Sequence, residues 1–200
     1  VVRDNIDTDQ IISAQYLNLV PTIAEEYEKL GSYALDGLPK SLYATRYVKD
    51  GQLDSDYPIV VAGKNFGCGS SREDAPIAMG SANCEIVLAE SFARIFFGNC
   101  VALGIVAVAA APDDVAKLMD AVELDPAQEV QIDLENLVAT WRGGSAPVRM
   151  PDGARKQLLD GSWDAMGTLL EARELTVRFG GLTLSRDREG RALVWFSALG

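Results

Sequence analysis

The chain of 200 residues contains no histidine. Without imidazole it cannot form a Ser-His-Asp or Cys-His catalytic arrangement of its own, and it cannot build a zinc site with histidine ligands. A serine of this chain that takes part in chemistry would therefore need some other group to activate its hydroxyl.

Cysteine is scarce. Cys68, Cys84 and Cys100 are an odd number of residues, and no two of them have Cys-x-x-Cys spacing. They fit neither a disulfide framework nor a metal knuckle, and they are not a set that could ligate an iron–sulfur cluster. We expect Cys84 and Cys100 to be small, buried hydrophobic residues.

Segments that would direct the chain to a membrane are also missing. No run of 18 apolar residues occurs, so no transmembrane helix is predicted, and the residues from Val1 to Asp4 do not begin a hydrophobic signal segment. We therefore expect a cytoplasmic protein. Because the first residue is not methionine, we also expect the native N-terminus to lie upstream.

Basic residues are outnumbered, with 18 Lys and Arg against 29 Asp and Glu and a net charge of −11. This balance argues against nucleic acid and against an anionic membrane surface as partners. An anionic ligand would have to be attracted locally, against the overall charge. The 48% of hydrophobic and 24% of charged residues are ordinary for one soluble globular domain, with room for an appendage.

The most distinctive stretch is residues 63–76, which read Gly-Lys-Asn-Phe-Gly-Cys-Gly-Ser-Ser-Arg-Glu-Asp-Ala-Pro. The apolar run 58–62 before it predicts a buried strand, and residues 77–79 after it predict a helix. Gly67 and Gly69 permit positive φ and a close approach of the backbone to a ligand. The pattern predicts a strand, a glycine-rich loop and a helix in succession.

The polar residues of this loop suit an anion. A helix N-terminus offers unpaired N–H groups and a partial positive charge, and Arg72 can hold a carboxylate or phosphate through two parallel hydrogen bonds. A tight turn with a serine cap is the simpler alternative. The helix start is open as well: Ser71 could be the cap, or Pro76 could exclude Ala75 from the helix and leave Asp74 as the cap.

Periodicity elsewhere predicts strands that alternate with short helices, which indicates an α/β fold with parallel strands. A hairpin with a two-residue connection, Glu135-Asn136, is predicted near residue 135. The further strands are expected at 84–89, 101–110, 129–134 and 137–142. The helices are expected at 23–30, 91–97 with Ser91 as cap, 113–120, and 154–172 with an interruption at Gly161.

Three blocks of this sequence resemble the small subunit of 3-isopropylmalate dehydratase, a family similar to the swivelling domain of aconitase and homoaconitase. Asn65 to Glu73, Asn-Phe-Gly-Cys-Gly-Ser-Ser-Arg-Glu, resembles its signature. Asp4 to Ile12 resembles its Asp-Thr-Asp segment, and Ala89 to Phe96 resembles its next helix. The blocks occur in the family's order within about the first 110 residues, which makes the match specific.

The resemblance implies an α/β fold, namely a swivelling β/β/α three-layer domain of the aconitase C-terminal type, over residues 1–172. The resemblance does not cover residues 173–200, a C-terminal extension in which the residue pattern predicts strands at 175–179 and 191–196 that could form a hairpin. The resemblance also implies the small subunit of a heteromeric hydro-lyase of leucine biosynthesis. Such an enzyme dehydrates and rehydrates a 2-substituted malate of the isopropylmalate type.

The same resemblance implies a large aconitase-like partner subunit that carries a [4Fe-4S] cluster, with no cofactor bound by this chain. The substrate would be a small di- or tricarboxylic acid. Ser70 would be the catalytic base, and the loop glycines Gly67 and Gly69 would offer backbone N–H groups to its oxyanion. The substrate contacts implied are Arg72, Ser71, Thr8 and Asp9, with Asn18 in a specificity loop.

Several of these residues have simpler alternatives. Residues 7–9 could be an Asx or ST turn, and Asn18 could be an exposed loop residue without a role. Arg94 could join the anion site or could form a surface salt bridge. The chain also has Asp74 where the family commonly has histidine, so Asp74 either points away as a cap or indicates a different substrate.

Two rival functions follow from these alternatives. One is an isomerase subunit that acts on another alkyl- or aryl-malate or on a homocitrate-like acid. The other is a non-catalytic, anion-binding regulatory subunit.

Overall fold

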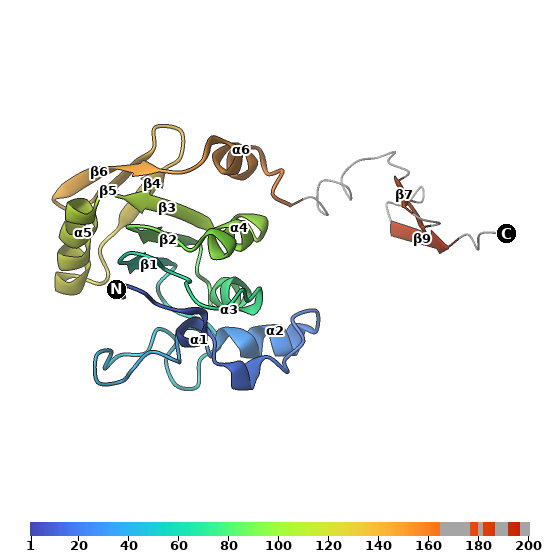
Figure 1. Cartoon of the computed structure of the whole chain (residues 1–200), viewed down its shortest axis with the longest axis horizontal. Helices are drawn as coiled ribbons and strands as arrows, with labels where there is room; N and C mark the ends of the chain where they lie inside the picture. Colours follow the sequence, from blue (N-terminus) through green and yellow to red (C-terminus); the bar gives the residue numbers. More distant parts are fainter. Residues whose placement is uncertain (165–176, 180–181, 187–191, 197–200) are drawn as a thin grey trace.

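The computed structural model describes residues 1–164, 177–179, 182–186 and 192–196 (Figure 1). Its main sheet has six strands in the order β1-β2-β3-β6-β5-β4. The first three strands are parallel, and β6, β5 and β4 continue the sheet antiparallel. The strands are β1 (Ile59–Ala62), β2 (Ile86–Ala89), β3 (Val106–Ala110), β4 (Val130–Asp133), β5 (Val138–Trp141) and β6 (Gly144–Arg149).

Each parallel strand is followed by a helix, and further helices come before β1 and after β6. The helices are α1 (Thr8–Ile11), the 3-10 turn η1 (Ala14–Tyr16), α2 (Ala24–Gly31), α3 (Asp74–Ser81), α4 (Arg94–Ala102), α5 (Pro112–Leu124) and α6 (Asp152–Asp160). The succession β1-α3-β2-α4-β3 is the alternation that the sequence predicts.

The parallel strands bury both faces, because side chains alternate along a strand. Val60 and Ala62 of β1 belong to one core cluster, together with residues of α1, α3 and α4. Val61 belongs to a second cluster, with residues of α5, β5 and β6. Figure 1 shows α5 on the opposite side of the sheet from α3 and α4. This layered α/β arrangement agrees with the expected fold class.

The direction of the parallel strands determines where polar loops meet. The carboxyl ends of β1, β2 and β3 lie at one edge of the sheet, since the three strands pair in parallel. The loop after β1 and the loop after β2 therefore emerge side by side. In open α/β sheets this edge is the usual place for a ligand site.

Some boundaries differ from the sequence expectation. Residues 101 and 102 belong to the end of α4 and not to a strand, and β3 begins at Val106 after a turn in which Gly104 has φ 75°. The β4–β5 connection has four residues, 134–137, because Asp133 pairs with Val138. The Asp133 carboxylate accepts hydrogen bonds from the backbone N–H groups of Glu135 and Asn136 and closes this longer turn.

Strand β6 was not expected from the sequence. Its residues Gly-Ser-Ala-Pro-Val-Arg lack the β-branched and aromatic run that predicts a strand. The segment is held in the sheet by its two neighbours, β3 and β5. Its last residue, Arg149, lies opposite Ala109 of β3.

The C-terminal strands are β7 (Val177–Phe179), β8 (Leu182–Arg186) and β9 (Ala192–Phe196), which pair antiparallel in that order. The expected hairpin was therefore wrong in its pairing, because β8 lies between the two predicted strands. The expected boundary between residues 172 and 173 lies outside the described residues and stays a prediction, as does the part of the terminal helix beyond residue 164. Within the described part of the chain, no helix has the length and apolar character needed to cross a membrane.

Candidate functional site

The glycine-rich loop after β1 is held on one side by the N-terminal segment. The backbone N–H of Asn5 donates to the carbonyl of Lys64 at 2.9 Å, and that of Gly67 donates to the carbonyl of Ile6 at 2.8 Å. The N–H of Thr8 then donates to the carbonyl of Cys68 at 2.8 Å. These bonds align residues 5–8 with the loop almost as a further parallel strand.

The other side of the loop is held by residues 91–93. The N–H of Phe66 donates to the carbonyl of Ser91 at 3.0 Å, and the N–H of Ala93 donates to the carbonyl of Phe66 at 2.9 Å. The Ser91 hydroxyl accepts from the N–H of Asn65 at 2.9 Å. We call these two sets of bonds the backbone clamp. Because Ser91 serves the clamp, it does not cap α4, which begins at Arg94 after an N-cap without a side-chain hydrogen bond.

Gly67 is required by close packing. It has φ 76°, and a Cβ added there would lie 2.1 Å from Cγ of Phe96. The Phe96 side chain is buried, and its ring packs edge-on against Phe66 with centroids 5.3 Å apart. Gly69 has φ 91°, but an added Cβ would come only within 3.3 Å of Asp7. The two glycines thus differ in how strictly the structure excludes a side chain.

Helix α3 begins differently from both sequence alternatives. Its first residue is Asp74, the residue before it is Glu73, and no side chain caps it, so neither Ser71 nor Asp74 is the N-cap. Pro76 is the third helical residue. Its missing N–H is harmless there, because the first four N–H groups of a helix have no partner within the helix.

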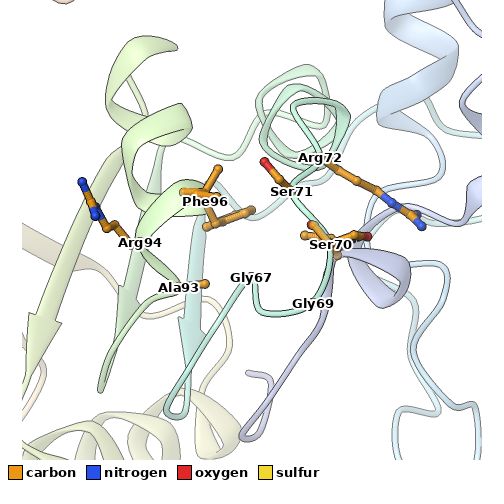
Figure 2. A pocket seen from close by; sticks show the side chains of 10 residues that line it. Gly67, Gly69, Ser70, Ser71, Arg72, Ala93, Arg94 and Phe96 are labelled. Carbon is orange, nitrogen blue, oxygen red and sulfur yellow. Dashed lines mark hydrogen bonds between the residues drawn. The ribbon is translucent and has the colours of Figure 1, made fainter.

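The loop and the start of α4 enclose a pocket of about 580 Å³, which we call the site pocket (Figure 2). Figure 2 shows the Ser71 side chain pointing from the loop toward the Phe96 side of this pocket. The loop side is lined by Thr8, Gly67, Gly69, Ser70, Ser71 and Arg72, and the opposite wall by residues 93–96. The structure therefore brings together all the predicted site residues except Asp9 and Asn18.

Thr8 positions Ser70. Its hydroxyl donates to the carbonyl of Ser70 at 2.9 Å and lies 3.4 Å from the Ser70 hydroxyl. Thr8 is only 2% exposed, whereas Ser70 is exposed. A buried threonine thus fixes the backbone on which an accessible serine stands.

Arg72 is held by two acceptors. Its guanidinium forms an ion pair with Asp9 at 2.7 Å and donates to the carbonyl of Ile12 at 3.2 Å. Its side chain is 16% exposed, and Figure 2 shows it extending away from the side on which Ser71 points. Asp9 therefore contacts Arg72 and does not line the pocket. Asn18 is exposed and is also not a lining residue, so its role stays a prediction.

The apolar wall was missed at the sequence level. Ile95, which is 54% exposed, and the buried Phe96 face the serines across the pocket. The third block of the sequence resemblance contains both residues, but no side-chain chemistry distinguishes them there from core residues. Arg94 lines the same pocket, and Figure 2 shows its side chain pointing away from Ser70 and Ser71.

The three cysteines are free and form no disulfide bond with one another. Cys84 and Cys100 are buried, as expected, and burial raises the pKa of the Cys84 thiol to about 12. Partial burial, with the Asp7 carboxylate nearby, raises the pKa of the Cys68 thiol as well. Among the described residues, no group of three or more His, Cys, Asp or Glu side chains is arranged to hold a metal ion.

The sequence model described as the aconitase C-terminal domain matches residues 2–113, which include β1, the loop, α3, β2, α4 and β3. The chain belongs to the aconitase C-terminal domain family. The match covers every residue that lines the site pocket.

The similar curated proteins are small subunits of 3-isopropylmalate dehydratase, which confirms the resemblance seen in the sequence. The Synechocystis protein is 37% identical over 178 residues, 86% of this chain and 82% of that protein. A Thermus thermophilus protein is 37% identical over 185 residues, 88% of this chain and 86% of that protein.

The similarity to small subunit 3 of Arabidopsis thaliana is higher but shorter, with 59% identity over 104 residues. That match includes 52% of this chain and spans only 41% of the plant protein's length. Among solved structures, 3-isopropylmalate dehydratase from Methanocaldococcus jannaschii matches with a TM-score of 0.60 and 27% identity. The match covers 85% of this chain and 92% of that chain.

The packing at Gly67 gives the first prediction. We expect Gly67→Ala to lower the free energy of unfolding by about 1–3 kcal/mol, because the new methyl group must displace the buried Phe96 ring and the residue must keep a positive φ. Urea unfolding of the isolated chain measures this.

Gly98→Ala is the matched control. An added Cβ there meets no atom within 4 Å, and the residue lies inside α4. We expect it to leave stability unchanged or to raise it by up to about 1 kcal/mol, because alanine favours a helix. Equal stability of Gly67→Ala and the wild type would show that Phe96 does not fix the loop.

Proposed function

We propose that this chain is the small subunit of a 3-isopropylmalate dehydratase-type hydro-lyase, an activity that belongs to leucine biosynthesis. The observation that carries the proposal is the site pocket, in which Ser70, Ser71 and Arg72 stand on a clamped loop opposite an apolar wall. The similar proteins of Synechocystis and Thermus thermophilus, which are small subunits of that enzyme, support the same conclusion. The activity requires a large subunit, because this chain supplies only part of the chemistry.

Arg72 is the proposed ligand of a substrate carboxylate. A guanidinium has five N–H donors, and Asp9 and the Ile12 carbonyl use only part of them. Both acceptors contact Nη1 of Arg72, which leaves the donors of Nη2 and Nε for a ligand. A substrate carboxylate can then take the remaining donors in a bidentate geometry. The Ser71 hydroxyl, which points into the pocket, adds a further hydrogen bond to substrate.

Ser70 is the proposed base. It removes a proton from the carbon next to the one that bears the departing hydroxyl, so that a C–H and a C–O bond break and a carbon–carbon double bond forms. A free serine hydroxyl is too weak an acid to be deprotonated by itself. The N–H of Gly67 donates to the carbonyl of Ile6, so it does not serve the oxyanion as the sequence suggested. The N–H groups of the loop after Gly67 and the positive charge of Arg72 would stabilise the oxyanion, with Thr8 fixing the position of Ser70.

The reaction is completed by groups outside this chain. A [4Fe-4S] cluster, expected in the large subunit, would supply a Lewis acid for the departing hydroxyl. When water is added back at the neighbouring carbon, Ser70 returns the proton to the carbon that lost the hydroxyl. Docking of the two chains would therefore assemble the site.

The apolar wall supports a substrate with an alkyl side group. Ile95 and Phe96 offer hydrocarbon surface on the side of the pocket that faces the serines. An isopropyl group fits such a wall, because contact with it removes apolar surface from water. Asp74, where the family commonly has histidine, does not line the pocket and gives no reason to prefer another substrate.

The direct test is reconstitution with the purified large subunit of the same organism, with its cluster loaded under anaerobic conditions. We expect the pair to interconvert 2- and 3-isopropylmalate. Each chain alone should be inactive. A complex that forms but converts neither acid would contradict the proposed function.

Ser70→Ala should lower kcat of the reconstituted enzyme by at least about 10²–10⁴-fold, the usual contribution of a positioned proton acceptor. Binding of the large subunit should remain, because Ser70 is exposed and is held mainly through its backbone. Ser145→Ala, which changes an exposed serine of β6, is the control and should retain full activity. If Ser70→Ala kept more than half of kcat, another group would have to be the base.

Arg72→Lys should raise KM for the dicarboxylate and also lower kcat. Lysine keeps the charge but loses the planar fork, and each hydrogen bond to a charged group contributes about 1.5–3 kcal/mol. We therefore expect kcat/KM to fall by at least about tenfold in steady-state kinetics. Arg142→Lys, at an exposed arginine paired with Asp125, is the control and should change neither constant. Unchanged constants in Arg72→Lys would refute the carboxylate site.

A further inference from the structure

A second cavity, of about 480 Å³, lies next to the site pocket. Its apolar lining includes Phe92, Phe97 and Met150, and its charged lining consists of Arg94, Arg149 and Glu90. It lies where the parallel half of the sheet meets the antiparallel half, since Ala109 of β3 pairs with Arg149 of β6. We call it the second cavity.

Two cationic side chains of this cavity lack a partner. Within the described part of the chain, neither Arg94 nor Arg149 forms an ion pair or a side-chain hydrogen bond. The other arginines of residues 1–164 all have partners: Arg3, Arg46, Arg72 and Arg142 form ion pairs, and Arg155 donates to two backbone carbonyls. In a chain with net charge −11, carboxylates are plentiful. Two unpaired guanidinium groups in one cavity are therefore notable.

The floor of the cavity is apolar and firmly supported. The rings of Phe92 and Phe97 contact each other with centroids 6.0 Å apart, and Phe92 also packs edge-on against Phe66 of the clamped loop. Met150 is 7% exposed. Arginine, aromatic residues and methionine are the residues enriched at the centres of protein–protein interfaces.

The second cavity and the site pocket share a border. Arg94 lines both, and the neighbouring Ile95 exposes 54% of its surface at the rim of the site pocket. Anything bound in the second cavity would lie beside the proposed substrate. The two cavities thus adjoin at Arg94, the first residue of α4.

We propose that the second cavity is a docking site for an acidic segment of the large subunit, whose carboxylates pair with Arg94 and Arg149 while an apolar side chain covers Phe92 and Phe97. This inference rests on the proposed function, because it names where the partner binds. A segment docked there would contact Arg94, which also lines the site pocket.

The charges favour a protein segment over a free small anion. Glu90 stands at the same cavity and would repel a diffusible dianion, whereas a polypeptide can place a basic or neutral group against it. A positive area on a chain with net charge −11 also favours one orientation of an acidic partner segment.

Titration calorimetry of this chain with the purified large subunit, at low and at physiological salt, gives the dissociation constant of their complex. We expect Arg149→Glu to weaken binding by at least about tenfold at low salt, since an arginine that becomes buried in an interface is a typical hot spot. Arg149→Lys should recover part of that loss. Arg142→Glu, the same change in the turn between β5 and β6, should bind like the wild type. Circular dichroism checks that the variants fold.

The outcomes separate this inference from the proposed function. If the wild-type pair binds and is active but Arg149→Glu binds equally well, the docking site is refuted and the function stands. If the wild-type chain does not bind the large subunit, the proposed function fails first, and the docking inference fails with it. A titration of the isolated chain with inorganic phosphate, followed by NMR, probes the free-anion alternative. Saturable binding that Arg149→Glu abolishes, together with unchanged affinity for the large subunit, would assign the cavity to a small anion and overturn the inference.

Discussion

The backbone clamp on the loop after β1 is the constraint on which the site depends. The loop is not part of the sheet, yet Gly67 donates to Ile6 on one side and Phe66 donates to Ser91 on the other. Because backbone hydrogen bonds fix direction as well as distance, the loop leaves the sheet along one path only. That path presents Ser70 and Ser71 at the pocket and brings Thr8 under Ser70. The backbone clamp therefore positions Ser70 and Ser71, although neither serine forms one of its hydrogen bonds.

Aromatic packing extends this order to the neighbouring helix. Phe66 of the loop contacts Phe96 in the wall of the site pocket and Phe92 in the floor of the second cavity. The two cavities therefore rest on one set of rings, and Gly67 has to be glycine because Phe96 occupies the space of its Cβ. A change in the position of α4 would move both cavities at once. Partner docking and substrate binding would thus act on a common support.

Sequence reasoning reached the parts of the fold in which local pattern and final environment agree. The apolar run before the loop became β1, and the glycines took the positive φ that their position suggested. Sequence reasoning failed where contacts between residues far apart in the sequence determine the local structure. Ser91 was expected to cap a helix, but its backbone and hydroxyl bond residues 65 and 66, which lie next to it only in the folded chain.

The same limit explains the missed cavity. Strand β6 has the composition of a loop and is held in place by β3 and β5, so the position of Arg149 could not be predicted. Arg94 was recognised as a candidate, but Arg149, which lines the same cavity, was not. The ion pair between Arg72 and Asp9 could not be predicted either. An arginine and an aspartate can pair with each other or can each contact a substrate, and the sequence does not distinguish these arrangements.

The central claim is that the loop is already ordered in the isolated chain, before any partner binds. Hydrogen exchange of single backbone amides, followed by NMR on the isolated chain, tests it most directly. The amides of Thr8, Gly67 and Ala93 donate to clamp carbonyls, so they should exchange at least about a hundredfold more slowly than unstructured peptide amides. Exchange of these three amides at unstructured rates, while those of β2 remain protected, would show that the loop forms only on docking and would contradict the account.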